Sequence, residues 1–431
     1  MLDIRFIREN AERVQEAAGQ KGYQVDIAQL IKLDDKRREA LSAAEVLRKE
    51  RNEISSHMKG GKPSKELVER GKQLKVKLAE VEERLRSLEE EFIQLLKKVP
   101  NMPLADVPIG ATEDENVVVK TVGTPPVFSF APKNHAEIGE ARGWIDKERA
   151  AKVAGSRFAY VKGDLALLWF ALLNFAFSVV TNEDTLRKII DENNLDVSSK
   201  PFTPVLPPAV ARTDAYDATA RLNKEEQTYK LADDDLWLNA SAEHTMAPMY
   251  LGEILDEAAL PIRYIGYTTA FRREAGTYGK DMEGIFRLHQ FNKLEMESFT
   301  TGETSLQEHL LMVAIQEHLM QQLELPYRVV LKCTADIGGP NARGVDIDTW
   351  LPGQGKYRET HTADLITDYQ ARRMQTRVRR TGGDVEMAHT NDATAFSERP
   401  MIAILENYQN EDGTIRVPKV LQPFMGGRKV M

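Results

Sequence analysis

The sequence predicts a helical hairpin followed by a larger domain of mixed helices and strands. Two observations support this prediction. Apolar residues recur at heptad spacing through most of the first hundred residues. A stretch punctuated by proline and glycine, from Val99 to about Pro132, then leads into a region where strand-like and helical patterns mix. We expect an N-terminal domain over residues 1–110 and a second domain over residues 111–431, within the two or three domains that 431 residues allow.

The composition is that of an ordinary globular protein. Hydrophobic residues make up 42% of the chain and charged residues 29%, which excludes wholesale disorder and a collagen-like fibre. The single cysteine, Cys333, excludes an intramolecular disulfide framework and a multi-cysteine zinc site. The first ten residues lack the apolar core of a signal peptide. The longest apolar run, Leu165–Val180, is shorter than the roughly 20 residues that span a bilayer. We therefore expect a soluble cytoplasmic protein without a membrane partner, and a buried helix over that run.

Each arm of the hairpin is predicted by its own apolar stripe, and together the arms cover about residues 33–98. The stripe of the first arm consists of Leu33, Ala40, Ala44, Leu47 and Ile54, and that of the second of Leu67, Leu74, Leu78, Val81, Leu85, Leu88, Phe92 and Leu95. Steps of three, four and seven residues are typical of a coiled-coil seam. The segment Lys59–Ser64 separates the stripes, and its Gly-Gly pair ends a helix while Pro63-Ser64 suits a new start. The two helices are therefore expected to run antiparallel.

The charge of the chain is unevenly distributed. The formal net charge is −8, yet the segment Arg48–Lys77 alone carries +6. This segment covers the tip half of the hairpin, and a basic patch on an acidic protein is a typical footprint for a polyanion such as nucleic acid. Two plainer interpretations stay open, namely a solvated helix face and a coiled coil that serves dimerisation.

The second domain has none of the glycine-rich loops that cradle phosphates, so a bound nucleotide must be held by side chains. The segment Tyr267–Phe299 suits that task. Its second half alternates like a strand, with Arg287, Phe291 and Glu295 at intervals of four and therefore on one face. A cation, an aromatic ring and a carboxylate then stand in a row, although charged residues on an edge strand are usually only solvated.

Several of these segments together resemble the bacterial seryl-tRNA synthetase family of class II aminoacyl-tRNA synthetases over essentially the whole chain. The matching segments are MLDIRFIREN, FRREAG with RLHQFNKLE, LPGQGKYRE, TDYQARR, the hairpin, and AILENYQNEDGTIRVPKVLQPFMGG. The resemblance implies an α+β fold with an antiparallel catalytic sheet of six to seven strands flanked by helices. It also implies a homodimer, formed through Leu165–Val180 and the following segment around Pro207 and Pro208.

The implied function is serine–tRNA ligation. ATP activates serine to seryl-adenylate with the help of Mg²⁺, and the seryl group moves to serine tRNA, whose long variable arm lies on the hairpin. The family implies that selenocysteine tRNA can also be charged. In the first step a carboxylate attacks a phosphorus that is itself negatively charged, so arginine and Mg²⁺ are needed to neutralise the repulsion. The carboxylate is already ionised, and no general base is required.

The resemblance assigns roles to residues of this chain. Arg272, Arg287 and Arg399 correspond to the catalytic arginines. Glu359 and Thr362 correspond to the metal site. The ATP-binding set is Arg272, Arg273, Glu274, Arg287, Phe291, Glu359, Thr360, His361, Thr362 and Arg399. The serine-binding set is Ser241, Ala242, Glu243, Arg272, Glu295, Asn391 and Ala393. Within these sets, Phe291 is the ring on which adenine stacks, Glu274 accepts from the adenine amino group, and Glu295 takes the serine ammonium group.

Some positions depart from the family pattern, and they lie at the amino-acid pocket. Ser241 replaces a threonine, and the run Thr360–Leu365 replaces the family's serines and cysteines. Ala393 stands where the family has a hydroxyl, and Ser397-Glu398 replaces small residues. A lost hydrogen bond to the substrate costs about 0.5–1.5 kcal/mol. Thr394 or His361 could replace it.

Two other functions compete with serine–tRNA ligation. A related ligase charges a carrier protein, but such homologues lack the long basic hairpin. A tRNA-binding paralogue with an inactive site is the non-enzyme alternative. The presence of Arg272, Glu274, Arg287, Glu295, Glu359 and Arg399 argues against it.

Overall fold

The computed structural model describes residues 1–59, 64–222, 227–274 and 283–431. The chain forms two compact units, Met1–Met102 and Pro103–Met431. Residues 60–63 of the predicted hairpin turn lie outside the described residues, as do most of the polar residues predicted to precede the alternating strand, 275–282.

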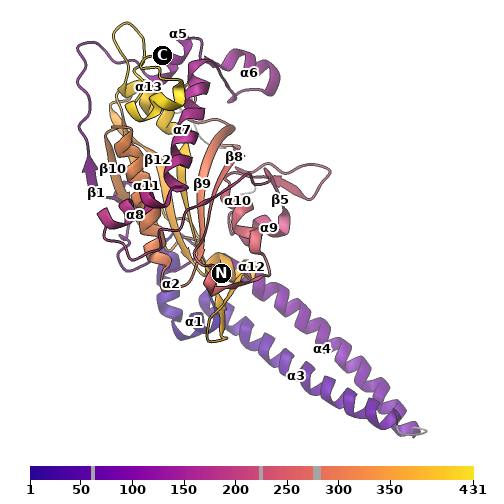
Figure 1. Cartoon of the computed structure of the whole chain (residues 1–431). Helices are drawn as coiled ribbons and strands as arrows, with labels where there is room; N and C mark the ends of the chain where they lie inside the picture. The colour runs from indigo at the N-terminus through magenta and orange to yellow at the C-terminus, as the bar shows by residue number, and fades with distance from the viewer. Residues whose placement is uncertain (60–63, 223–226, 275–282) are drawn as a thin grey trace. The chain divides into compact units, whose positions relative to one another are not determined.

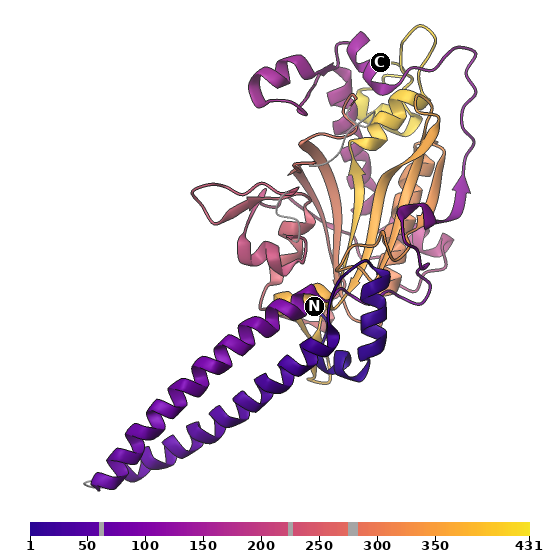
Figure 2. The ribbon, with the colours of Figure 1, turned by 180° about the vertical axis from the view of Figure 1, so that it is seen from behind.

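The secondary structure described in the first unit consists of helices, and it contains the predicted hairpin (Figures 1 and 2). Its helices are α1 (Ile4–Glu9), α2 (Ala11–Gln20), α3 (Ile27–Lys59) and α4 (Lys65–Lys98). The Ser64 hydroxyl caps α4 by accepting a hydrogen bond from the backbone N–H of Leu67. Ala40, Ala44 and Leu85 pack together between the two long helices. The heptad prediction is therefore confirmed.

The second unit is built on an eight-stranded sheet with the strand order β1-β10-β11-β12-β15-β9-β8-β4. The strands are β1 (Val117–Val122), β10 (Tyr327–Leu331), β11 (Arg343–Leu351), β12 (Lys356–Thr367), β15 (His389–Ser397), β9 (Gln290–Thr300), β8 (Ile262–Phe271) and β4 (Thr203–Val205). All neighbours are antiparallel except β4 and β8. The predicted α+β class is confirmed, and the described sheet exceeds six or seven strands because β1 and β4 pair at its two edges.

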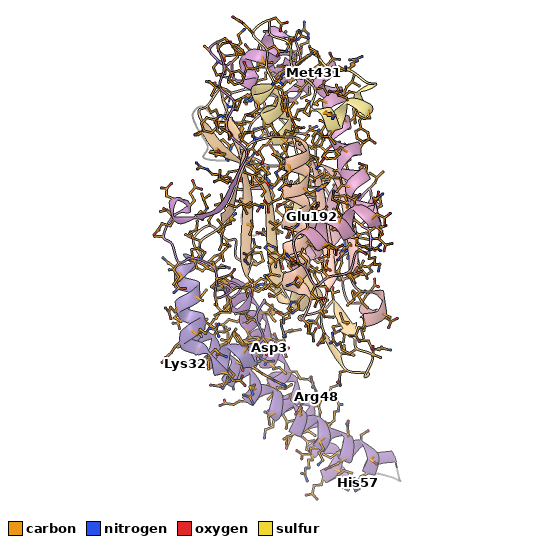
Figure 3. The ribbon with its side chains drawn as sticks, turned by 60° about the vertical axis from the view of Figure 1, so that its left-hand side comes forward. Asp3, Lys32, Arg48, His57, Glu192 and Met431 are labelled. Carbon is orange, nitrogen blue, oxygen red and sulfur yellow. The ribbon has the colours of Figure 1, made fainter. Side chains whose placement is uncertain are left out.

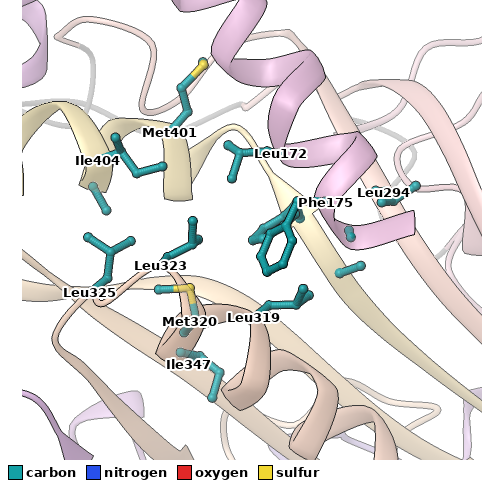
Figure 4. Packing of buried hydrophobic residues seen from close by; sticks show 14 of the residues in the cluster. Leu172, Phe175, Leu294, Leu319, Met320, Leu323, Leu325, Ile347, Met401 and Ile404 are labelled. Carbon is teal, nitrogen blue, oxygen red and sulfur yellow. The ribbon is translucent and has the colours of Figure 1, made fainter. Parts of the chain in front are cut away.

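One face of this sheet is covered by helices and forms the main core (Figure 4). Leu172 and Phe175 come from α7 (Asp164–Val180), Leu319 from α11 (Ser305–Gln322) and Ile404 from α13 (Arg399–Asn407). The apolar run predicted to be a buried helix is α7, and ten of its 17 residues are buried. Its hydrophobicity is thus largely explained by the chain's own core.

Side-chain alternation gives the sheet two chemically different faces. In β9, Leu294 and Met296 belong to the core, whereas Glu295 and Glu297 point to the opposite face. The neighbouring strands follow the same rule. We call the face opposite the core the site face. Its residues on the central strands are Glu295, Glu297, Asp346, Thr362, Asp364, Asp392 and Thr394.

The remaining elements are short or peripheral. The helices are α5 (His135–Ala141), α6 (Lys147–Ala154), α8 (Glu183–Glu192), α9 (Thr213–Ala218), α10 (Glu243–Met246) and α12 (Tyr369–Met374). The small strands are β2 (Ile145–Asp146), β3 (Tyr160–Val161), β5 (Val210–Arg212), β6 (Leu236–Leu238), β7 (Ile254–Asp256), β13 (Arg377–Arg379) and β14 (Val385–Met387). Within the described ranges, no single helix is long and apolar enough to cross a membrane; α7 and α8, bent by 76°, meet that test only as a pair.

Candidate active site

A cavity of about 130 Å³ opens at the sheet, where cationic side chains converge from separate elements. Arg272 follows β8, Arg287 precedes β9, and Arg399 begins α13. The residues that line it are Arg272, Glu274, Ile285, Phe286, Arg287, Leu288, Phe291, Lys293, Glu359, Thr360, Thr362, Thr394, Ser397, Glu398 and Arg399. Eight of the ten residues expected to bind ATP are in this lining. The concentration of cations favours a polyanionic ligand.

Arg272 is held by a backbone carbonyl and an aromatic ring. Its Nε and Nη2 donate to the Ala240 carbonyl oxygen at 3.2 and 3.1 Å. Its guanidinium lies 5.2 Å from the centre of the Phe291 ring, close enough for a cation–π interaction. The guanidinium is thereby oriented within the cavity lining, and it occupies one face of Phe291.

The other two arginines are each paired with a carboxylate. Arg287 Nη1 donates to Glu274 Oε2 at 2.9 Å. Arg399 Nη1 lies 3.1 Å from Glu359 Oε1, and its guanidinium lies over the Phe286 ring. Desolvation works to raise the pKa of Glu359, but Arg399 and Lys332 outweigh it and lower that pKa to about 2. Glu359 is therefore ionised at neutral pH.

The strand prediction for Arg287 was wrong, although the residue does reach the cavity. Strand β9 begins at Gln290, so Phe291 and Glu295 share its face, whereas Arg287 lies in the preceding turns. The physical reason is strand pairing. The ladder between β8 and β9 ends with Phe271 opposite Gln290, and Phe271 is the last residue of β8, so Arg287 has no partner on that strand.

Four residues of the expected serine-binding set, Ser241, Ala242, Glu243 and Glu295, are not part of the cavity lining. Ser241 Oγ donates to Glu295 Oε2 at 3.1 Å, and Lys293 Nζ lies 2.5 Å from the same oxygen. Glu243 Oε1 accepts from Arg221 Nε at 2.8 Å. Both carboxylates are therefore already paired with cations of the chain. Ala242 is fully buried beside them.

The structure corrects the placement of Asn391 and Ala393. Ala393 pairs with Met296 and Ala363 and belongs to the main core. Asn391 points the same way and donates to the Ser298 hydroxyl at 3.2 Å. Both residues therefore face away from the site face. The phase of the strand explains the error, because β15 presents alternate residues, Asp392 and Thr394, to the site.

Two residues of the expected ATP-binding set also point elsewhere. Burial lowers the pKa of His361 to about 3, and its ring packs 5.7 Å from Phe396 on the core side of the sheet. Arg273 donates to the Thr228 carbonyl oxygen at 2.7 Å and covers the ring of Tyr229. Neither is part of the cavity lining.

Sequence reasoning gave no role to five charged residues around the serine-binding set. Arg221 and Lys293 are the cations, and Glu297, Asp364 and Asp392 are the acids. Glu297 was discoverable, because it lies two residues after Glu295 on an alternating strand. Arg221 carried no local signal, since its segment reaches Asp364 and Asp392 only through the fold.

Protein side chains of the cavity can supply only part of the coordination shell of a metal ion. Among the described residues, no three His, Cys, Asp or Glu side chains form a metal-binding group. Glu359 is ionised, and the Thr362 hydroxyl lies on the site face opposite Asp346 of β11. Magnesium in phosphate sites usually takes one or two carboxylates and completes its shell with phosphates and water. Glu359 and Thr362 therefore fit Mg²⁺ held jointly with a nucleotide.

Comparison with protein families assigns both units. Residues 228–408 match the tRNA synthetase class II core domain (G, H, P, S and T), and residues 1–103 match the seryl-tRNA synthetase N-terminal domain. A serine–tRNA ligase from Thermodesulfovibrio yellowstonii is 39% identical over 436 residues, which cover 99% of each chain.

Two solved structures are similar over the whole chain. Seryl-tRNA synthetase from Pyrococcus horikoshii, complexed with ATP, has a TM-score of 0.87 and 36% identity, and the match covers 100% of this chain and 99% of that one. Cytoplasmic serine–tRNA ligase from Naegleria fowleri, in complex with AMP, has a TM-score of 0.83 and 29% identity over 100% and 98% of the two chains.

Proposed function

Because the chain belongs to the seryl-tRNA synthetase family, we propose that it is a serine–tRNA ligase whose adenylate forms in the arginine-lined cavity. The observation that carries this assignment is the convergence of Arg272, Arg287 and Arg399 on one cavity. The arginines of this cavity are suited to ATP, whose phosphates need several cations when no glycine-rich loop is present.

In the first reaction, a carboxylate oxygen of serine attacks the α-phosphorus of ATP. The bond from that phosphorus to the bridging oxygen breaks, and pyrophosphate leaves with the electron pair. No proton moves. Arg272 neutralises the two negative reactants, and Arg287 and Arg399 bind the departing phosphates. Mg²⁺, held by Glu359 and Thr362 together with the nucleotide, supplies further charge neutralisation when bound.

The adenine and serine ends of the site are proposed from the remaining residues. Adenine stacks on the face of Phe291 that Arg272 does not occupy, with Glu274 accepting from its amino group. The serine ammonium group pairs with Glu295, near Ser241 and Glu243, and displaces Lys293 from that carboxylate. In the second reaction, a hydroxyl at the 3′ end of tRNA attacks the seryl carbonyl and AMP leaves.

We assign tRNA binding to the first unit, because the hairpin carries a basic tip. Arg48 and Arg70 pair with Glu82 and Glu50 on the facing helix and so hold the hairpin together. Lys49, Lys75 and Lys77 are exposed, and no ion pair involves them in the part of the chain that the structure describes. Figure 3 shows side chains such as Arg48 and His57 on these helices. The long variable arm of serine tRNA, or of selenocysteine tRNA, is the proposed partner.

We propose that the active form is a cytoplasmic homodimer. Leu167 and Phe170 are the large exposed apolar residues of α7, with exposed fractions of 47% and 55%. They lie three residues apart on one side of that helix. The Pro207-Pro208 segment follows Leu206, which is also largely exposed. A second copy would cover this apolar surface.

Amino-acid-dependent exchange between ATP and pyrophosphate tests the function directly. Serine is expected to support exchange, whereas alanine is rejected because a site that reads a hydroxyl leaves polar groups unpaired without it. Threonine is rejected less strongly, since it keeps the hydroxyl. Ser241, Glu243, Thr362 and Thr394 are the groups we expect to read the hydroxyl. If none of the amino acids supports exchange, the protein is an inactive paralogue and the proposal is overturned.

A further inference from the structure

A row of three buried carboxylates crosses the site face behind the cavity. Asp364 on β12 lies opposite Asp392 on β15, and Asp392 lies opposite Glu297 on β9. Their exposed fractions are 7%, 3% and 0%. Like charges directly opposite each other on neighbouring strands destabilise a sheet, and burial adds to the cost. We call these three residues the acid row; serine ligation, as described above, uses none of them.

The acid row is one step from the cavity. Side chains two residues apart on a strand share a face, and Thr362, Thr394 and Lys293 line the cavity. Thr362 is two residues from Asp364, and Thr394 is two residues from Asp392. Glu295 lies between Lys293 and Glu297 in the same way. A ligand that reaches Glu295 therefore meets the acid row next.

The nearby cations are too few for the carboxylates. Arg221 lies 3.2 Å from Asp392 and 3.5 Å from Asp364 and also serves Glu243, while Lys293 serves Glu295. Lys332 also acts on Asp364, but its ion pairs are with Asp336 and Asp346. Among the ion pairs of the described residues, two cations thus serve these five buried carboxylates. Both carboxylate oxygens of Glu297 are buried without a hydrogen-bond partner, and so is one oxygen each of Glu295 and Asp364. Unpaired buried oxygens of this kind call for a donor.

Burial and mutual repulsion set the charge of the acid row in the absence of a ligand. Burial raises the pKa of Glu297, and the neighbouring Asp392 raises it further. Burial likewise raises the pKa of Asp392, with a contribution from Glu243 that Arg221 opposes. Protonation is therefore one way to satisfy these groups, and a bound cation is the other. A metal ion is disfavoured, because no described group of three side chains has a metal-binding arrangement.

We propose that the amino-acid pocket also accepts a small amino acid whose side chain ends in an ammonium group, with 2,3-diaminopropionate as the form that matches serine in size. This inference rests on the proposed function, because the α-ammonium group must pair with Glu295. The second ammonium group then points toward Glu297 and Asp392. It offers three N–H donors where the serine hydroxyl offers one, and charge-assisted hydrogen bonds are the stronger kind.

The test compares three amino acids of equal size in pyrophosphate exchange by the full-length protein. Serine, 2,3-diaminopropionate and 2-aminobutyrate differ only in carrying a hydroxyl, an ammonium or a methyl group at the side-chain end. The assay is run at neutral and mildly acidic pH, since the two ammonium groups of the diamino acid lower each other's pKa. We expect kcat/KM for 2,3-diaminopropionate to exceed that for 2-aminobutyrate by at least about 100-fold.

Variants of the acid row add a second measurement. Glu297→Gln and Asp392→Asn are each expected to lower the ratio of kcat/KM for 2,3-diaminopropionate to that for serine by about tenfold or more. The control is Glu386→Gln, an exposed carboxylate paired with Arg380, which should leave the ratio unchanged. The substrate series needs no variant, so it decides the matter even where a substitution prevents folding.

The outcomes separate this inference from the proposed function. Exchange with serine, together with equal and poor use of 2,3-diaminopropionate and 2-aminobutyrate, would overturn the inference alone. Such a result would mean that the acid row is satisfied by protons. Loss of serine exchange in the unmodified protein would instead overturn the proposed function.

Discussion

At the scale of single residues, Arg272 connects the two ends of the proposed site. It is fixed by the Ala240 carbonyl group and by Phe291 before any substrate binds. A cation that is already oriented needs little rearrangement when charge develops, and such preorganised groups usually contribute most to catalysis. The contribution of Arg272 should therefore be seen in the rate of adenylate formation.

Replacing Arg272 with alanine should lower kcat for serine-dependent pyrophosphate exchange by roughly 10²- to 10³-fold, with a smaller change in KM for ATP. Arg272→Lys is the matched comparison, because lysine keeps the charge but cannot donate from two nitrogens to the Ala240 carbonyl. We expect the kcat of Arg272→Lys to lie between that of the unmodified protein and that of Arg272→Ala. Exchange kinetics close to normal in Arg272→Ala would contradict the role given to this residue.

Glu398 gives a pH-dependent prediction for stability. Burial raises its pKa to about 7, although Asn292 donates to it from the backbone and the side chain. Between its ordinary pKa and about 7, the folded protein binds a proton that the unfolded chain has released. This contribution to the free energy of unfolding therefore falls as the pH rises through that window. The limit is about 3 kcal/mol for a difference of this size.

Glu398→Gln keeps an acceptor for Asn292 and has no charge to bury. The variant should be more stable than the unmodified protein at mildly alkaline pH, and the difference should shrink toward mildly acidic pH. Urea unfolding at both pH values measures this directly. A constant difference between the two proteins would show that Glu398 does not titrate in the window.

At the scale of elements, the proposed tRNA binding by the hairpin and the proposed dimer contact of α7 can be tested separately. Ala44 and Leu85 pack in one cluster between α3 and α4. Residues 45–84 can therefore be replaced by a short glycine-serine turn without parting the two helices. The shortened protein should retain serine-dependent exchange and lose aminoacylation of tRNA, because the basic tip is absent. Equal loss of both activities would contradict this division.

A gentler variant checks that the tip acts through its charge. Replacing Lys49, Lys75 and Lys77 with alanine removes exposed cations and keeps the paired arginines Arg48 and Arg70. Affinity for tRNA should fall and depend less steeply on salt concentration, since fewer counterions are released on binding. An unchanged salt dependence would place the tRNA contacts elsewhere.

Introducing one charged side chain tests the proposed dimer surface on α7. Phe170→Glu should shift the protein toward the monomer in sedimentation analysis, because it buries a carboxylate in an apolar contact. The control is Val153→Glu on α6, a residue with an exposed fraction of 74%. The two variants should differ if the surface is an interface. An identical monomer content in both would argue against it.

The same contrast between elements explains what could be predicted from the sequence. The stripes of α3 and α4 were recognisable because a coiled-coil seam is a local pattern. The resemblance supplied the sheet, but the phase of each strand depends on irregular pairing. Strand β15 is paired with β9 through a bulge between Thr394 and Phe396. That detail decides that Asp392, rather than Asn391, faces the site, and no local pattern reveals it.

At the scale of the whole molecule, every residue proposed for adenylate formation lies in the second unit, and the proposed tRNA arm lies in the first. Residues as far apart in the sequence as Arg272 and Arg399 line one cavity, and the antiparallel pairing of β8, β9 and β15 brings their segments together. The distribution of charge also differs between the two units. The first unit contains the basic segment Arg48–Lys77, whereas the second unit contains the buried carboxylates beside the proposed site.

The two-faced sheet has a consequence for how this protein tolerates change. On β9, β12 and β15, residues of the site face alternate with residues that belong to the hydrophobic core. A saturation scan should therefore show a tolerance profile with a period of two. The activity of variants at positions such as 295, 297 and 392 should depend on which amino acid is offered as substrate. The activity of variants at positions such as 294, 296 and 393 should depend on temperature. Libraries that vary only the first set could recode substrate choice while the scaffold stays intact.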